Sequence, residues 1–259
     1  VDKNLFPADH PYSWQVIGSL EDLQNAGVED VQNFFRRWYV PNNVTLTVAG
    51  DFDPVQAKAW VEKYFGEIAR GEDMEPRPKQ AASLAETKSL YYEDNFATLP
   101  ELRLTWPTVP VFHEDQYALD VLANYLATGK KAPLNKIVVD EKKLASGVFM
   151  FGRNSELAGT SSLIVRAFPG TNLNDVQAAF DEGFARFEAN GIPAADLDRI
   201  KIGMEVGFYD QIGSVLGKAI QLAQYDILAG DPGYGDQDIK NIQSVSAADV
   251  MRVYDTYIK

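Results

Sequence analysis

Side chains suited to metal or acid–base chemistry are few in this sequence. Its only histidines are His10 and His113, and it contains no cysteine. Disulfides, thiol nucleophiles and cysteine-ligated zinc are therefore excluded. His10 precedes a proline and a tyrosine, which predicts a loop histidine packed against aromatic rings; a functional role is the alternative. His113 and the acids after it are typical of a helix start, where negative charge is favoured; a weakly held metal ion is the alternative there.

Two arginines, Arg153 and Arg166, are the other candidates for a functional role. Each falls in a predicted strand, so the pair could contact a substrate from adjacent strands. The alternative is a solvated arginine on the surface of a strand. A group of aspartates nearer the C-terminus lacks the regular alternation of a calcium-binding loop. Its members are Asp226, Asp231, Asp236 and Asp238.

The stretch from Phe34 to Gly66 carries the clearest pattern of structural elements. A helix is predicted over about residues 28–39, with an apolar face, and it ends before a proline turn. Val44–Ala49 then alternates apolar and polar residues as a half-buried strand does. Asp53 and the proline after it predict the capped start of a helix that ends at Gly66. The predicted unit is helix, turn, strand, turn and helix.

The rest of the chain predicts an α+β fold, a mainly antiparallel sheet with helices packed on one face. Strands are expected at 89–94, 102–107, 148–153 and 162–168, and helices at 115–126, 133–143, 175–189, 193–228 and 236–258. Asn174 is the expected cap of the helix over 175–189. Four glycines inside the region 193–228 predict close approach to a neighbouring element, with a kink or break between Tyr209 and Ser214. Residues 70–79 are charged and contain proline, which favours an extended connection.

Composition limits the class of protein. The 259 residues allow one large domain or two of ordinary size. Apolar residues make up 46% and charged residues 24%, as in a packed soluble protein. The formal net charge of −13 argues against a nucleic-acid or anionic-membrane partner. Acidity could favour basic substrates, with solubility as the simpler explanation. No apolar run is long enough to span a bilayer, and no signal-peptide pattern opens the chain.

The first residue is Val1 rather than methionine, which we interpret as the start of a processed product or a fragment. The compartment is therefore unknown, and an exported or periplasmic location stays open.

Several of these motifs together resemble the pitrilysin/insulinase-type zinc metallopeptidases, an inverzincin family that includes the mitochondrial processing peptidases. The matching features are a YVPNN turn at 39–43, a strand ending in GD at 50–51, and a helix ending in FG at 65–66. Upstream, HPY at 10–12 and a glycine at 18 resemble the segment that precedes this unit in the family. The resemblance covers most of the chain, and its sharpest motifs lie in the first 70 residues.

The two ends of the chain also resemble each other at a constant offset of 219 residues, the difference between positions 20 and 239. The matched pairs are Leu20 and Ile239, Leu23 and Ile242, Asp30 and Asp249, Phe35 and Tyr254, and Trp38 and Tyr257. Chance similarity of two amphipathic helices is the alternative. A duplication predicts three parts. Residues 1–69 form the end of a first, catalytic-type repeat, and residues 70–88 form a linker. Residues 89–259 form a second, non-catalytic repeat that stops before its last strand and helix.

The resemblance implies zinc held by an HxxEH helix and a more distant glutamate, with the motif's own glutamate as general base. No such motif occurs in this chain. The counterpart helix of the second repeat is 115–126, where Asp120, Ala123 and Asn124 stand near the expected positions. Inactive domains of the family often supply an arginine and a tyrosine seven positions apart. The matching stretch has Val139 and Ser146 there, so we expect that pair to be absent.

We therefore expect the non-catalytic portion of a zinc-dependent metalloendopeptidase, which helps enclose and position extended polypeptide substrates and is inactive alone. No catalytic or metal-binding residue is predicted here, and zinc is expected only in the intact protein. Expected partners are a polypeptide substrate and the missing catalytic segment or a homologous peptidase subunit. The alternatives are an inactive peptidase-like scaffold or partner subunit in a larger assembly, and an unrelated α+β binding module. Exposed sheet edges in residues 1–69 would favour self-association.

Overall fold

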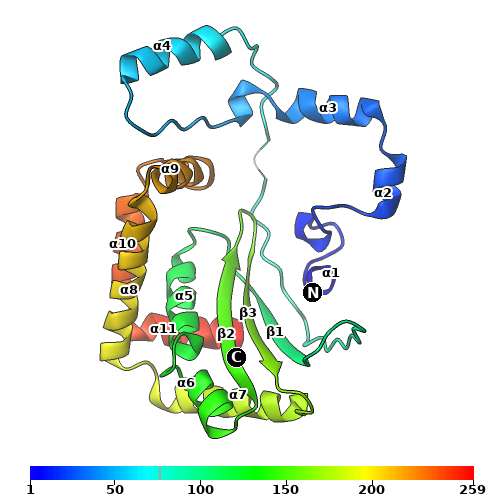
Figure 1. Ribbon diagram of the computed structural model, residues 1–259, viewed down its shortest axis with the longest axis vertical. Helices are drawn as coiled ribbons and strands as arrows, with labels where there is room; N and C mark the ends of the chain where they lie inside the picture. Colours follow the sequence, from blue (N-terminus) through cyan, green and yellow to red (C-terminus); the bar gives the residue numbers. More distant parts are fainter. Residues whose placement is uncertain (76) are drawn as a thin grey trace. The chain divides into compact units, whose positions relative to one another are not determined.

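The computed structural model describes residues 1–75 and 77–259, which divide into two compact units (Figure 1). The first unit comprises residues 1–13, 79–207 and 236–259, and the second comprises residues 14–78 and 208–235. The predicted linker, residues 70–88, includes residue 76, which lies outside the described residues. Within the described part of the chain, no helix has the length and apolar character needed to cross a membrane.

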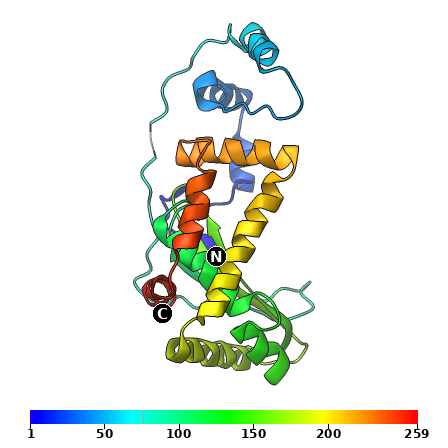
Figure 2. The ribbon, with the colours of Figure 1, turned by 90° about the vertical axis from the view of Figure 1, so that its left-hand side faces the viewer.

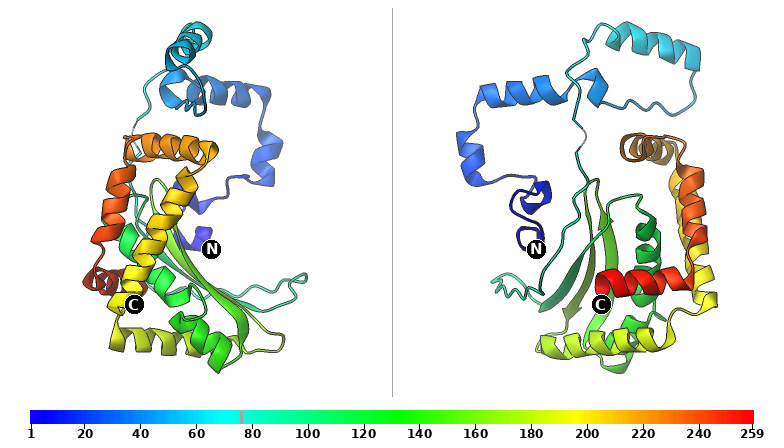
Figure 3. Two further views of the ribbon diagram at one scale, coloured as in Figure 1. Left: turned by 60° about the vertical axis from the view of Figure 1, so that its left-hand side comes forward. Right: turned by 180° about the vertical axis from the view of Figure 1, so that it is seen from behind.

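A three-stranded antiparallel sheet organises the first unit. Its strands are β1 (Glu101–Thr108), β2 (Ala145–Asn154) and β3 (Gly159–Ala167), in the order β1-β3-β2. Helices pack on one side of this sheet, as the view from behind in Figure 3 shows. The predicted α+β class, with a mainly antiparallel sheet and helices on one face, is confirmed, and so are three of the four strands predicted after residue 88.

Most of the remaining chain is helical. In the first unit the helices are α1 (Asp2–Leu5), α5 (Glu114–Ala127), α6 (Pro133–Asn135), α7 (Leu173–Asn190), α10 (Gly235–Ser244) and α11 (Ala247–Val253). Short 3-10 and π segments are η1 (Pro11–Ser13), η3 (Lys136–Glu141) and η4 (Tyr254–Ile258). The second unit contains the helices α2 (Leu20–Asn25), α3 (Val28–Trp38), α4 (Pro54–Phe65) and α9 (Val215–Ala229) and the 3-10 segment η2 (Pro41–Asn43). Helix α8 (Ala194–Ile212) belongs mostly to the first unit.

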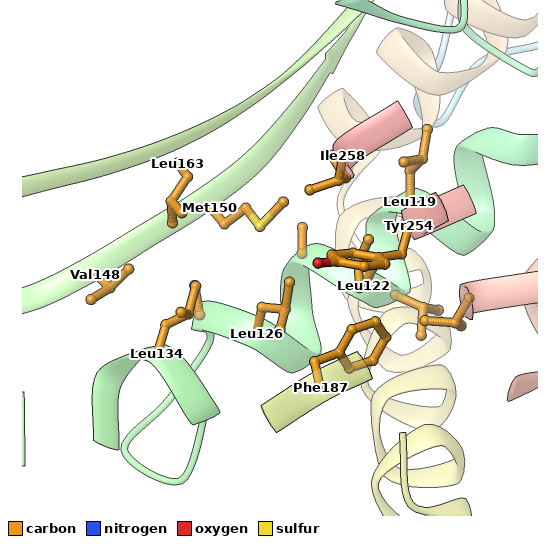
Figure 4. Close-up of a cluster of buried hydrophobic side chains, with 14 of the residues drawn as sticks. Leu119, Leu122, Leu126, Leu134, Val148, Met150, Leu163, Phe187, Tyr254 and Ile258 are labelled. Carbon is orange, nitrogen blue, oxygen red and sulfur yellow. The ribbon is translucent and has the colours of Figure 1, made fainter. Parts of the chain in front are cut away.

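The core of the first unit forms where α5 lies against the inner face of the sheet (Figure 4). Leu122 and Leu126 of α5 and Leu163 of β3 have no exposed surface. Burying side chains of this size stabilises the fold by about 1.5–3 kcal/mol each. Phe187 of α7 and Tyr254 of η4 close the same cluster, with ring centroids 5.0 Å apart. Helix α8 lies beside α10 (Figure 2). Lys201 of α8 donates to the carbonyl of Gln243 in α10 and to that of Val245 just after it.

Asp115 joins the start of α5 to the C-terminal helices. Its buried carboxylate accepts hydrogen bonds from Arg252 and from the Tyr257 hydroxyl, both at 2.6 Å. Burial raises the pKa of Asp115, but the bonds from Arg252 and Tyr257 outweigh burial and hold that pKa below its ordinary value. The carboxylate therefore stays charged and holds α11 and η4 against α5.

The pKa of Asp120, further along α5, is shifted in the opposite direction. Burial raises the pKa of Asp120 to about 6, a hydrogen bond with Gln116 opposes the rise, and the charge of Asp238 adds to it. A Cβ added at Gly152 of β2 would lie 3.2 Å from this carboxyl group, so the glycine leaves space for it. The charged form of Asp120 therefore costs the folded state free energy.

The second unit has hardly any core. No described side chain between residues 14 and 78 is buried. Phe34, Phe35 and Trp60 are about half exposed. Asp53 caps α4 by accepting from the amides of Val55 and Gln56, as predicted, so local signals alone define this helix. Burial of apolar surface is the main source of folding free energy, and this stretch lacks it.

Two strand predictions are wrong. Residues 44–49 and 89–94 form neither a helix nor a strand. Val44 has extended backbone angles, so its conformation suits a strand, but a strand also needs a hydrogen-bonded neighbour. No described segment pairs with either stretch.

The predicted long helical region is broken where expected, since α8 ends at Ile212 and α9 begins after Ser214. Ser214 caps α9 by accepting from the Gly217 amide, and an added Cβ at Gly217 would lie 1.7 Å from the Gln211 carbonyl, so the turn between the helices requires a glycine there. The expectation of close approach is wrong for Gly203 and Gly207, where a Cβ would meet nothing within 4 Å. The cap of α7 is Asn172, which accepts from the Asn174 amide, and Asn174 itself lies inside the helix.

Asp115→Asn should destabilise the first unit by about 2 kcal/mol at neutral pH, because it removes the charge that Arg252 faces. Since the folded pKa of Asp115 is lowered, the wild-type protein loses this stabilisation as pH falls below about 4, and the two proteins should converge there. Urea unfolding followed by circular dichroism measures both effects. Asp198→Asn, at an exposed position of α8, is the control; equal effects of the two substitutions would contradict this account.

Asp120→Asn should stabilise the first unit at alkaline pH. The folded pKa is raised, so the wild-type protein loses stability as pH rises from about 4 to above 6, by at most about 3 kcal/mol. The variant has no charge to desolvate and should show a flat profile over that range. Thermal unfolding at a series of pH values tests this, and parallel profiles for both proteins would exclude the mechanism.

Candidate functional site

The face of the sheet turned away from α5 and α7 is the candidate functional surface. Side chains alternate between the two faces of a strand, and the register fixes which residues share a face. Phe149 is 64% exposed and Phe151 47% exposed, whereas the intervening Met150 points into the core and is buried. We call this surface the open face; its residues are Glu101, Arg103, Thr105, Pro107, Phe149, Phe151, Arg153, Thr160, Ser162, Ile164 and Arg166.

Arg153 and Arg166 both lie on the open face, but the structure does not bring them together. Arg153 stands opposite Thr160 of β3, and Arg166 lies six residues further along that strand. Six strand residues span about 20 Å, so the two guanidinium groups cannot bind one small group. Arg153 is exposed and makes no hydrogen bond or ion pair with any residue that the structure describes.

Arg166 is held by Glu101, whose carboxylate accepts from its Nε at 3.0 Å. Arg103 donates to the other oxygen of Glu101 at 3.2 Å. Burial raises the pKa of Glu101, but the bonds from Arg166 and Arg103 outweigh it, so the pKa lies below its ordinary value. Arg166 is thus partly neutralised, and among the described residues of this face Arg153 is the cation without an ion pair.

A cleft of about 1280 Å³ runs beside β1 on the side away from β3. One wall is β1 from Arg103 onward, a second is the extended segment 79–88, and a third combines α7 with residues 254–259. Trp106 and Phe184 pack edge to face, with ring centroids 6.2 Å apart, and line the cleft on its core side.

The backbone of β1 offers hydrogen bonds to this cleft. The amide of Ala167 donates to the Pro100 carbonyl at 2.9 Å, which fixes the phase of the β1–β3 ladder. In an antiparallel pair, every second residue bonds to the same neighbouring strand. Because Pro100 bonds to β3, Leu102, Leu104 and Trp106 also direct their backbone groups toward β3. The N–H and C=O groups of Arg103 and Thr105, between them, face the cleft. Pro107 falls in the cleft-facing set, where a missing N–H costs no sheet bond.

Sequence reasoning missed the cleft and the open face as surfaces. Pro107 inside a predicted strand was a signal for an edge strand. The alternation of Phe149, Phe151 and Arg153 was a signal for a face without a covering helix. Which edge and which face lacked a partner depended on the pairing of distant strands.

Both histidine rings take part in the local structure. His10 is buried and stacks on Phe6 with ring centroids 4.7 Å apart, so the predicted aromatic packing is confirmed. Its Nε2 bonds to the Gln80 carbonyl, and its Nδ1 accepts from the Tyr12 amide, both at 3.0 Å. His113 caps α5 by accepting from the Asp115 amide, as expected for a helix start.

Helix α5, the expected counterpart of a zinc-binding helix, has no suitable donor set. Ala123 carries no ligand atom, and Asn124 uses its amide to donate to the Asp120 carbonyl. The described residues include no group of three or more histidines, cysteines or acids that could hold a metal ion. The residues present on α5 therefore do not fit zinc.

The two positions where the family often has an arginine and a tyrosine are occupied here by Val139 and Ser146. Val139 lies in η3 and is half-buried, and Ser146 lies exposed at the start of β2.

Known proteins of similar sequence are zinc proteases. The chain is 26% identical over 258 residues to the zinc protease PqqE of Helicobacter pylori, covering 96% of this chain and 56% of that protein. It is 24% identical to the uncharacterized zinc protease YmxG of Bacillus subtilis, covering 92% and 57%. The chain thus spans just over half the length of these two curated relatives.

Solved structures show the same fold. A protease from Helicobacter pylori has a TM-score of 0.84 and 25% identity, covering 96% of this chain and 61% of that one. The peptidase M16 inactive domain from Pseudomonas fluorescens has a TM-score of 0.79 and 16% identity, covering 99% and 60%.

A family model described as the peptidase M16 inactive domain matches residues 25–204, more than half of the chain. The resemblance to pitrilysin/insulinase-type metallopeptidases is thereby confirmed, and the chain belongs to the peptidase M16 inactive-domain family.

Proposed function

We propose that this chain is the non-catalytic portion of a zinc-dependent metalloendopeptidase, and that its open face helps enclose and position an extended polypeptide. The observation that supports this most is the open face itself, where two exposed phenylalanines and an uncompensated arginine alternate along β2 of an M16 inactive domain. Exposed apolar side chains gathered on one surface are typical of interaction sites.

The open face suits an extended chain better than a compact ligand. Phe149, Phe151 and Arg153 repeat at the two-residue spacing of β2, which is the spacing of an extended peptide lying alongside. Thr105 and Ser162, whose hydroxyl oxygens are 3.2 Å apart, continue the face with polar groups. Such a surface would hold many sequences by shape, with little selection for one side chain.

The proposal places zinc and the catalytic groups in another part of the intact protein. That part is the upstream segment of the same chain or a homologous peptidase subunit, and it would face the same polypeptide. In this proposal α5 supplies no ligand to the metal, because among the described residues it holds no group of donors that could bind one.

The proposal also includes a duplicated domain: residues 1–69 close one repeat, and residues 89–259 form most of the next. Local structure supports the offset of 219. It maps Val28, the first residue of α3, to Ala247, the first of α11, and Asn25, the last of α2, to Ser244, the last of α10. Asp30 and Asp249 each accept from the amide of the N-cap residue three positions earlier.

Burial differs between the two copies. Val250 and Tyr254 are buried in the core of the first unit, whereas their counterparts Val31 and Phe35 are 52% and 50% exposed. This difference supports a first repeat whose own sheet would be supplied by further chain or by a partner.

The chain alone should not hydrolyse peptides. We expect no cleavage of an unstructured fluorogenic peptide with added zinc, because no metal-binding group exists among the described residues. Zinc with and without a chelator is the comparison, and turnover that the chelator abolishes would refute the non-catalytic assignment.

The open face should bind unstructured polypeptide. Phe149→Ser with Phe151→Ser should weaken binding of a labelled unfolded polypeptide about tenfold, because two exposed apolar contacts are lost. Fluorescence anisotropy measures the affinity. Ile202→Ser, which removes a 59% exposed side chain from α8, is the matched control. If the control weakens binding as much as the double variant, the open face is not the binding surface.

A further inference from the structure

We propose that the cleft beside β1 binds an added β-strand, and that its occupant is residues Val44–Ala49 of a second copy of this chain. This inference does not need the peptide-positioning role, because it uses the edge of β1 and leaves the open face unoccupied, but its choice of occupant rests on the duplicated domain of the proposed function.

The acceptor is the free edge of β1. Arg103 and Thr105 present N–H and C=O groups to the cleft, and Pro107 presents a carbonyl. An unpaired edge of this kind is a template for another strand. The cleft extends along β1 from Arg103 to the end of the strand, which is enough for a six-residue strand of about 20 Å.

The donor segment has the matching side-chain pattern. Val44, Leu46 and Val48 are 61%, 56% and 50% exposed in this chain. On a strand these three share one face, and Thr45 and Thr47 share the other. In the cleft, the apolar face would lie beside Leu104 and Trp106, which point toward the core side, and the threonines would continue the row of Arg103 and Thr105 on the open face.

The repeated helices indicate why this segment in particular fits. Helix α3 leads into residues 44–49, and its counterpart, α11 with η4, ends beside the cleft, which residues 254 and 256–259 line. Tyr254 and Tyr257 in the cleft wall correspond to Phe35 and Trp38 of α3. Residues 44–49 therefore follow a helix of the same type as the helix that ends beside the cleft, α11 with η4.

Two copies can exchange these segments reciprocally, because each chain has one donor segment and one cleft. Reciprocal exchange gives a closed dimer with two-fold symmetry. The competing occupant is residues 89–94 of the same chain, where Leu90, Tyr91 and Tyr92 are 62%, 88% and 85% exposed. A cleft filled by that segment would leave the chain monomeric.

The test compares two pairs of variants by sedimentation equilibrium. Arg103→Pro removes the side chain and the cleft-facing N–H, and Arg103→Ala removes the side chain alone. Leu46→Lys places a charge on the apolar face of the donor, and Thr47→Lys places it on the opposite face. We expect a wild-type dimer whose dissociation constant rises at least about thirtyfold for Arg103→Pro and Leu46→Lys and changes little for the two controls.

A peptide spanning residues 42–51 provides a second measurement that does not depend on the folding of any variant. Labelled peptide should bind the wild-type chain, and an excess of unlabelled peptide should convert the dimer to monomers. A wild-type chain that is monomeric at every concentration would overturn the proposal, with or without peptide binding. So would a dimer that neither the peptide nor Leu46→Lys weakens.

Discussion

Every strand in this protein depends on finding a neighbour for its backbone N–H and C=O groups. Strand β3 has neighbours on both sides, and β1 and β2 are the edges of the sheet. Residues 44–49 and 89–94 have strand-like sequences, but no segment that the structure describes pairs with them, and they remain irregular. This requirement for a neighbouring strand explains why β1 has a free edge beside the cleft and why two strand predictions failed. It also explains why the apolar side chains of residues 44–49 in the second unit stay exposed.

Helix boundaries, the antiparallel sheet and the helices on one of its faces could be predicted from the sequence, because these follow from local caps and periodicity. The N-cap Asp53 and the break before Gly217 are of this kind. The open face and the cleft could not be predicted from the sequence, because the exposure of Phe149 and of the edge of β1 depends on elements far apart in the chain. Arg153 and Arg166 were identified as candidates from their strands, but only the register shows that they lie about 20 Å apart.

Helix α5, which we propose as the counterpart of a zinc-binding helix, has a structural role in this chain. Asp115 uses its charge to hold the C-terminal helices, and Asp120 keeps a desolvated carboxyl near β2. Nearby stand Ala123, which has no ligand atom, and Asn124, which donates to the Asp120 carbonyl. Sequence and structure thus agree that α5 supports the sheet, and the sheet presents its other face outward.

The central claim is that the open face contacts an extended polypeptide. Photo-crosslinking of an unfolded polypeptide, followed by peptide mapping, tests this most directly. The account predicts crosslinks on β2, at Phe149, Phe151 and Arg153, and few on the helical side of the unit. Crosslinks concentrated on α8 and α10, with β2 unmodified, would contradict it.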